Sequence, residues 1–192
     1  MTSAVVLFWI FRYEIMISTS ILAGDFKGTR LKVGRIRRLR PTVSRIRGSI
    51  FNIVSDIRDA TVLDLYAGVG TLGFEALSRG AISVTFIDYQ REAVNLIRQN
   101  SFLFKNRDIT VYMMDSMRFL RKTDKKFDVI FADPPYGTQN LSALKQLAWD
   151  HLAEEGTLVI ESAVRDQWCE KNALIKRYGD TQISIFKKEL QT

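Results

Sequence analysis

The stretch ATVLDLYAGVGTLGFEALSRG, residues 60–80, carries the pattern that decides the fold. Its first part, 60–68, is a short apolar run that predicts a buried strand ending in glycine, and 71–80 predicts a helix closed by a glycine. Three glycines form a G-x-G-x-x-G pattern across the junction: Gly68, Gly70 and Gly73. Such a loop allows the backbone to approach a ligand and leaves N–H groups free at the start of the helix. The stretch therefore predicts a strand, a cofactor-binding loop and a helix.

The rest of the chain continues the alternation of strands and helices. Strands are expected at 83–88, 109–115, 127–133 and 156–162, and helices at 44–57, 91–104, 116–122 and 141–153. This alternation predicts a parallel sheet with helices on both faces. Two alternating runs around 178–181 predict a closing hairpin. We therefore expect an α/β fold of the Rossmann-like class I methyltransferase plan, with a mostly parallel seven-stranded sheet that ends in an antiparallel hairpin, and a small basic N-terminal extension.

Length and composition indicate one globular domain with an extension. The chain has 192 residues, of which 46% are hydrophobic and 26% charged. We divide it into an extension at 1–15, a basic arm and helix at 16–58, and a catalytic domain at 59–192. The apolar run at 4–11 is too short to span a bilayer and lacks the features of a signal peptide. We expect a cytoplasmic protein with no membrane association.

Two residue counts limit the chemistry. Cys169 is the only cysteine and His151 the only histidine in the sequence. A disulfide within the chain is impossible, and both zinc catalysis and a Ser-His-Asp triad are disfavoured, because they depend on cysteine or imidazole groups. His151 lies near the end of a predicted helix, where a solvated role is expected. We therefore expect no metal.

The basic residues are concentrated in one segment. The net charge is +7, and residues 27–47 hold nine lysines and arginines and no acid. The remainder of the chain is therefore slightly acidic. This asymmetry predicts a contact with a polyanion, for which Arg35, Arg37 and Arg38 are candidates, although a merely solvated arm is the alternative.

Acids near the glycine loop bear on the choice of cofactor. The G-x-G-x-x-G pattern fits a nicotinamide dinucleotide as well as S-adenosylmethionine, and Asp88, at the end of the next strand, could accept from ribose hydroxyls with either. Asp64 favours S-adenosylmethionine, because a carboxylate attracts its sulfonium and ammonium groups and repels a pyrophosphate. Asp115 either accepts from an adenine amine or caps the following helix. The predicted cofactor set is Asp64, Ala67, Gly68, Gly70, Asp88, Tyr89, Asp115 and Ser116.

The fourth strand runs into Asp133-Pro134-Pro135-Tyr136. If the first five strands have the order 3-2-1-4-5, the fourth lies beside the first, and this tetrad shares a crevice with the glycine loop. A carboxylate accepts hydrogen bonds, and proline carbonyls face no competing N–H, so the turn suits a planar NH₂ group. Tyr136 offers a ring on which a base can stack. The tetrad therefore predicts amine methylation, with a simple proline turn as the alternative.

These blocks resemble the bacterial small-subunit (16S) rRNA guanine-N2 methyltransferases of the RsmD type. The segments that carry the resemblance are LRPTVSRIRGSIFNIV, LDLYAGVGTLGFEALSRGA, VIFADPPY and RYGDTQISIF. The resemblance implies S-adenosylmethionine as cofactor and a guanine amine of 16S rRNA as acceptor, in free RNA, in the small ribosomal subunit or in an assembly intermediate. It also implies that Arg40, Thr42 and Arg45 lie near the mouth of the site, and we expect a monomer.

Three other functions remain open at this point. A DNA adenine-N6 methyltransferase uses a related tetrad, but the chain leaves little room for a separate target-recognition domain. An NAD-dependent oxidoreductase would share the glycine loop. A catalytically inert nucleic-acid binder would share the basic arm.

Overall fold

A computed structural model of the chain describes residues 19–34, 42–54, 56–137 and 140–190, apart from the side chains of residues 42 and 43. The expected extension at 1–15 and four of the candidate RNA contacts lie outside these ranges: Arg35, Arg37, Arg38 and Arg40. The helices are α1 (Thr42–Val54), α2 (Thr71–Ser78), α3 (Arg91–Ser101), α4 (Ser116–Leu120) and α5 (Leu141–Asp150), with a 3-10 turn at Val164–Asp166. The strands are β1 (Thr19–Ser20), β2 (Arg30–Leu31), β3 (Thr61–Leu65), β4 (Ser83–Asp88), β5 (Asp108–Met113), β6 (Phe127–Ala132), β7 (Leu152–Ala163), β8 (Leu174–Tyr178) and β9 (Thr181–Lys187).

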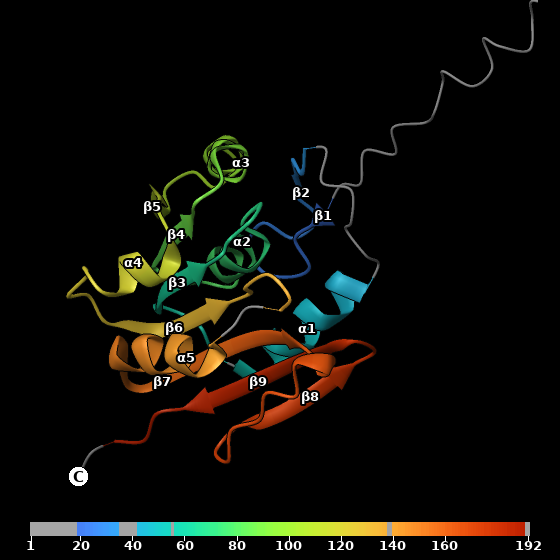
Figure 1. Ribbon diagram of the computed structural model, residues 1–192. Helices are drawn as coiled ribbons and strands as arrows, with labels where there is room; N and C mark the ends of the chain where they lie inside the picture. The colour runs from blue at the N-terminus through green and yellow to red at the C-terminus, as the bar shows by residue number, and fades with distance from the viewer. Residues whose placement is uncertain (1–18, 35–41, 55, 138–139, 191–192) are drawn as a thin grey trace, which may run out of the picture.

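The main sheet has seven strands in the order β5-β4-β3-β6-β7-β9-β8 (Figure 1). The first five strands pair in parallel, and β9 pairs antiparallel with both β7 and β8. The expected order 3-2-1-4-5 and the closing hairpin are therefore confirmed, as is the Rossmann-like class I methyltransferase fold. The strand β3, which precedes the glycine loop, lies beside β6, which precedes the tetrad.

The main difference from the expected elements lies at the start of β7. The helix predicted at 141–153 ends at Asp150, and the strand predicted to begin at 156 begins at Leu152. The register between β6 and β7 shifts between Phe127 and Val129, and Glu155 has a positive φ of 60°. The strand is thus longer than its apolar run, because its first residues pair across an irregularity that periodicity does not reveal.

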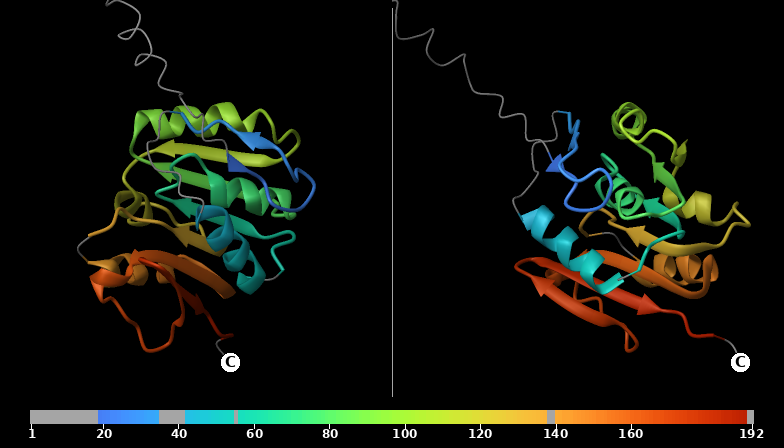
Figure 2. Two further views of the ribbon diagram at one scale, coloured as in Figure 1. Left: turned by 90° about the vertical axis from the view of Figure 1, so that its right-hand side faces the viewer. Right: turned by 180° about the vertical axis from the view of Figure 1, so that it is seen from behind.

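Helices cover both faces of the sheet (Figure 2). On one face, α1, α2 and α3 bury a core that includes Ile50, Phe74 and Ile97, and on the other α4 and α5 bury Leu120 and Leu144. Side chains alternate between the two faces along each central strand. No helix in the described ranges is long and apolar enough to cross a membrane.

The N-terminal segment 19–34 is bound to α2. The carboxylate of Glu75 accepts from the backbone N–H groups of Leu22 and Ala23 at 2.8 and 3.1 Å, and Ser78 Oγ accepts from Phe26 N at 2.9 Å. At Gly24, which has a φ of +84°, an added Cβ would lie 1.8 Å from the Ser78 carbonyl oxygen, so only glycine fits. Core residues before and after position 58 pack in one cluster. The predicted division between a basic arm at 16–58 and a catalytic domain at 59–192 therefore stays a prediction.

The closing hairpin is connected to α1. Ser49 Oγ of α1 forms a hydrogen bond with the hydroxyl of Tyr178 at the end of β8, and Phe51 packs against Phe131 of β6 with ring centroids 5.5 Å apart. In the sheet order the hairpin follows β7, which lies next to β6. The hairpin thus forms one wall of the space beyond the carboxyl ends of β3 and β6.

Candidate active site

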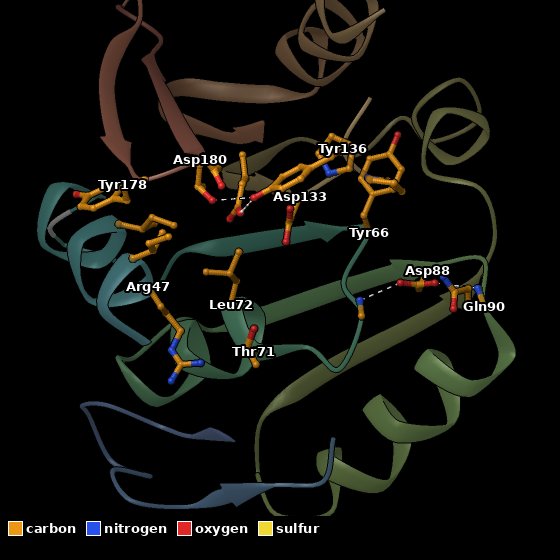
Figure 3. Close-up of a pocket in the computed structure, with 18 of the residues that line it drawn as sticks. Arg47, Tyr66, Thr71, Leu72, Asp88, Gln90, Asp133, Tyr136, Tyr178 and Asp180 are labelled. Carbon is orange, nitrogen blue, oxygen red and sulfur yellow. Dashed lines mark hydrogen bonds between the residues drawn. The ribbon is translucent and has the colours of Figure 1, made fainter. Parts of the chain in front are cut away.

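A cavity of about 770 Å³ opens at the carboxyl ends of the parallel strands (Figure 3). Its volume is in the range of small-molecule sites, and its position is where open α/β sheets bind ligands. Its walls come from the glycine loop, the end of β4, the tetrad after β6, β7, α1 and the hairpin. The lining residues used below are Arg47, Tyr66, Gly68, Asp88, Tyr89, Gln90, Asp133, Pro134, Pro135, Tyr136, Glu161, Tyr178, Asp180 and Thr181.

The glycine loop forms the floor beside β3. Gly68 and Gly70 have φ values of 57° and 82°, which favour glycine. An added Cβ at Gly68 would meet nothing within 4 Å, whereas at Gly73 it would lie 2.3 Å from the ring of Phe86. The first glycine therefore leaves open space beside the cavity, and the third brings α2 against the sheet.

Asp88 connects the loop to the end of β4. Its two carboxylate oxygens accept from Gly68 N and Gln90 N, both at 2.8 Å. The side chain is buried but lines the cavity, and Tyr89 beside it is exposed. Each carboxylate oxygen has a further lone pair, so Asp88 has the acceptor capacity expected for ribose hydroxyls.

Five of the eight predicted cofactor residues are not cavity-lining: Asp64, Ala67, Gly70, Asp115 and Ser116. Asp64 is buried and accepts from Gly73 N at 2.9 Å, and burial raises its pKa to about 8. Asp115 caps α4 by accepting from Arg118 N at 2.8 Å, which is the alternative role considered for it. Ser116 Oγ accepts from Tyr66 N at 3.3 Å. Asp64 and Ser116 thus hold backbone N–H groups at the two ends of the loop, and direct contact with a cofactor stays a prediction for all five residues.

Tyr66 is a site residue that the sequence did not indicate. It follows β3 directly, lines the cavity and has a φ of 58°. A bulky residue in the left-handed region is strained, and such residues are concentrated at functional sites. No feature of the sequence marks the strain, because tyrosine has no preference for this conformation.

Asp133 lies just after β6, and its backbone N–H donates to Leu65 O of β3 at 3.4 Å. The tetrad and the glycine loop thus lie at the ends of neighbouring strands, as expected. Within the described chain, no hydrogen-bond donor contacts the Asp133 carboxylate, which is open to the cavity. The residue is exposed by surface area, but nearby protein partly excludes water from its carboxyl group, and this desolvation, followed by the carboxylates of Glu161 and Asp64, raises its pKa.

Tyr136 connects the tetrad to β7 and the hairpin. Its hydroxyl lies 3.2 Å from Glu161 Oε1, to which it can donate, and 2.7 Å from Thr181 Oγ1. The side chain is 39% exposed, so its ring remains accessible at the mouth of the cavity. Glu161 and Thr181 were not predicted. The sequence feature that could have indicated Glu161 is its position at the end of an apolar run, in the strand that pairs with β6.

Arg47 corrects the interpretation of the basic segment. It is one of the nine basic residues of 27–47 from which a polyanion contact was predicted, but it is 1% exposed. Its guanidinium donates to Thr19 Oγ1 at 3.1 Å and to Ser20 O at 2.5 Å, and its Nε lies 3.5 Å from Glu75 Oε2. It is therefore tied to the protein's own carboxylate. The candidate Arg45 is exposed on α1, and three further basic residues, Lys27, Arg30 and Lys32, are exposed in the N-terminal segment.

The charges that line the cavity are mainly negative. Four acidic residues line it: Asp88, Asp133, Glu161 and Asp180. Arg47 is the one cationic residue in the lining, among the described parts of the chain. Because Arg47 is paired with Glu75, it neutralises little of this charge. The cavity therefore suits a cationic ligand and groups that donate hydrogen bonds, and it disfavours the pyrophosphate of a dinucleotide.

The chain is similar to known proteins in both sequence and structure. Residues 19–187 match the family model described as "Conserved hypothetical protein 95". The ribosomal RNA small subunit methyltransferase D of Buchnera aphidicola subsp. Baizongia pistaciae is 32% identical over 82% of this chain and 74% of its own length. The putative rRNA methyltransferase YlbH of Bacillus subtilis is 34% identical over 88% and 98%. The structure of the putative methyltransferase yhhF from Escherichia coli superposes with a TM-score of 0.80, at 31% identity over 91% of this chain and 99% of that one.

Proposed function

The chain belongs to the conserved hypothetical protein 95 family, its relatives include ribosomal RNA small subunit methyltransferase D, and we propose that it methylates 16S rRNA. The proposed reaction transfers a methyl group from S-adenosylmethionine to the exocyclic N2 amine of a guanine. One observation carries the proposal: the Asp133 carboxylate, free of any donor in the described chain, faces the same cavity as Gly68 and Asp88. An amine acceptor site and a cofactor loop therefore share one space.

The cavity residues fit S-adenosylmethionine. Asp88 would accept from its ribose hydroxyls, the open space at Gly68 would admit the ligand next to the backbone, and Tyr89 offers a ring beside it. The acidic character of the cavity suits the sulfonium and ammonium charges, and Asp64 adds a further carboxyl group behind the loop. When bound, the cofactor supplies a methyl carbon whose bond to sulfur breaks, with its electrons kept by sulfur, as the amine nitrogen donates its lone pair.

The tetrad residues would orient and activate the amine. The nitrogen of guanine N2 is a weak nucleophile, because its lone pair is delocalised into the ring. Acceptance of its hydrogens by Asp133 and by a proline carbonyl favours the positive charge that develops on nitrogen during attack. The Asp133 carboxylate would then take the proton that the nitrogen loses. Tyr136 would hold the base by stacking, and positioning of this kind makes a large contribution to rate.

The exposed basic residues would hold the RNA backbone outside the acidic cavity. Phosphates would be repelled by Asp133 and Glu161, so only a base turned out of its stack would enter. Arg45 on α1 and the sequence-predicted contacts Arg35, Arg37, Arg38, Arg40 and Thr42 are proposed to make these contacts. The protein is proposed to act as a cytoplasmic monomer on 16S rRNA or on a small-subunit particle.

Mass-spectrometric mapping of nucleosides tests the proposal. Small-subunit RNA and small-subunit particles would each be incubated with the protein and S-adenosylmethionine, digested and mapped. N2-methylguanosine at a defined position is the expected product. N6-methyladenine in treated DNA would instead favour the adenine-N6 function, and tight binding of NAD would favour an oxidoreductase.

A further inference from the structure

Glu161 is a second carboxyl group at the amine site. It belongs to β7, the strand next to β6, and Ala132 of β6 pairs in register with Ile160 of β7. The positions that follow this pair are Asp133 and Glu161. Val159 packs in the core under α1 and α2, whereas Ile160 packs on the opposite face, so alternation places Glu161 on the α1 side. Both carboxyl groups therefore line the cavity from neighbouring strands.

The surroundings of Glu161 orient it without satisfying it. The Tyr136 hydroxyl lies 3.2 Å from Oε1. Oε2 accepts no hydrogen bond from the described parts of the chain. Arg47, the one cationic residue of the cavity lining in these parts, is paired with Glu75 and is therefore not free to pair with Glu161. Burial raises the pKa of Glu161, while the Tyr136 hydrogen bond opposes this shift. The described protein therefore leaves acceptor capacity on both acidic groups, and each can accept a hydrogen bond from a ligand.

Among the four RNA bases, guanine alone offers two neighbouring donor sites of this kind. Its ring N1–H lies next to its exocyclic N2 amine. In adenine and cytosine the ring nitrogen beside the amine is an acceptor, and uracil has no amine. Two acceptors can share the two hydrogens of any exocyclic amine, but only guanine can give one acceptor an amine hydrogen and the other an adjacent ring N–H.

We infer that Glu161 accepts the N1–H of the target guanine while Asp133 accepts from its N2 amine, so that Glu161 sets the preference for guanine over other amine-bearing bases. This inference rests on the proposed function and assigns the recognition of the base to a residue outside the tetrad. Tyr136 then has two roles, because its ring stacks on the base and its hydroxyl holds Glu161 in place.

Binding of two nucleosides to the protein tests the inference. Guanosine has both N1–H and the 2-amino group, whereas 2-aminopurine riboside has the amino group and an unprotonated N1. The fluorescence of 2-aminopurine riboside would be titrated against the complex with S-adenosylhomocysteine, which cannot transfer a methyl group, and guanosine would be measured by competition. We expect the wild-type protein to prefer guanosine by about tenfold or more, the effect of one hydrogen bond to a charged acceptor.

The variants isolate the contribution of Glu161. In Glu161→Ala the preference should fall to within about twofold, and in Glu161→Gln it should be intermediate, because the amide keeps one acceptor. Glu155→Gln makes the same exchange at an exposed position near the other end of β7 and should keep the wild-type preference. Guanosine also has an O6 atom that 2-aminopurine riboside lacks. Contacts to O6 contribute equally to the preference of every variant, so they cancel when the preferences of two variants are compared. Calorimetry with S-adenosylhomocysteine checks that each variant retains its cofactor site.

Two results would overturn the inference. One is an unchanged preference for guanosine in Glu161→Ala, and the other is a wild-type protein that binds neither nucleoside. Nucleoside mapping separates these results from failure of the proposed function. If RNA treated with the wild-type protein contains N2-methylguanosine but the preference is independent of Glu161, only the inference fails.

Discussion

Two sets of acidic side chains on the same side of the sheet differ in how many partners the protein gives them. One set is Glu75, and the other is the pair of Asp133 and Glu161. Glu75 accepts from two backbone N–H groups and is paired with Arg47 and Arg79, the latter at 2.8 Å. We call this set the Glu75 cluster. Asp133 has no donor within the described chain, and Glu161 has one hydroxyl. A satisfied buried acid fixes a structure, whereas an unsatisfied acid at the end of a strand indicates a site for a ligand.

Removal of Glu75 should have the largest effect and should act on stability. Glu75→Ala leaves two backbone N–H groups without their acceptor and the buried Arg47 guanidinium without its counter-charge. We expect the free energy of unfolding to fall by about 3–5 kcal/mol, measured by urea denaturation. The control Asp25→Ala removes an exposed partner of Arg107 and should cost less than about 1 kcal/mol. Equal losses for the two variants would show that the Glu75 cluster does not stabilise the fold.

Removal of Asp133 should act on rate instead. Asp133→Ala is expected to reduce methyl transfer to small-subunit RNA by about 100- to 1000-fold, because an acceptor for the developing charge is lost. Stability should not fall, since the change removes an unsatisfied carboxyl group. Transfer of labelled methyl groups measures the rate, and calorimetry should find cofactor binding retained. Asp133→Asn, which keeps one acceptor, should lie between. Full activity of Asp133→Ala would refute the role given to this residue.

Two substitutions at Tyr136 separate its ring from its hydroxyl. Tyr136→Ala removes the stacking surface, which is worth about 1–3 kcal/mol, and should raise KM for RNA by about tenfold or more. Tyr136→Phe keeps the ring but removes the hydroxyl that bonds to Glu161 and Thr181, so it should mainly weaken the preference for guanosine over 2-aminopurine riboside. If both variants raise KM equally, the hydroxyl rather than the ring holds the RNA.

Cofactor affinity should depend on pH. The pKa of Asp64 is raised from 3.8 to about 8, so this carboxyl group is largely protonated in the free protein at neutral pH. A cation binds best to the ionised form, and affinity for S-adenosylmethionine should therefore rise with pH and level off above about 8. The rise should be at most about tenfold per pH unit for each proton released.

S-Adenosylhomocysteine is the matched control for this dependence, because it lacks the sulfonium charge and should show a shallower rise. Asp64→Asn should flatten the curve for S-adenosylmethionine. Calorimetry at several pH values measures both affinities. If the affinities for the two ligands changed in parallel with pH, ionisation of Asp64 would not affect binding of the sulfonium.

The smallest effect is expected in the basic arm. Neutralising Arg37 and Arg38 together should weaken RNA binding and reduce the slope of log affinity against log salt by about one for each phosphate that is no longer neutralised. This expectation rests on sequence alone, since both residues lie outside the described ranges. Lys122 and Lys125, exposed beyond α4, serve as a control of equal charge. An unchanged slope would remove the arm from the RNA contact.

The sequence predicted those parts of the site that depend on local pattern. The glycine loop and the tetrad follow from hydrophobic periodicity and turn residues, and both are where they were expected, because the strand order 3-2-1-4-5 assumed for them is the observed one. Positive φ values at Gly68 and Gly70 explain why glycines mark the loop.

The parts that were missed depend on partners distant in sequence. Arg47 resembles its basic neighbours until the fold places it against Glu75. Glu161 resembles the last residue of an apolar strand until β6 brings Asp133 beside it. Asp115 fitted both a cap and a cofactor contact, and the structure gives it the cap. Charge and periodicity alone do not identify which partner a buried ionic group will find.

The position of β9 between β7 and β8 has a consequence for biosynthesis. Thr181, which contacts Tyr136, belongs to this last strand of the sequence, and Ser49 and Tyr178 are 129 residues apart. At about 5–20 residues per second, the wall made by the hairpin emerges from the ribosome on the order of ten seconds after α1. The glycine loop of a nascent chain is therefore synthesised well before the strand that completes the wall at Tyr136, and the site is complete only when the end of the chain has been made.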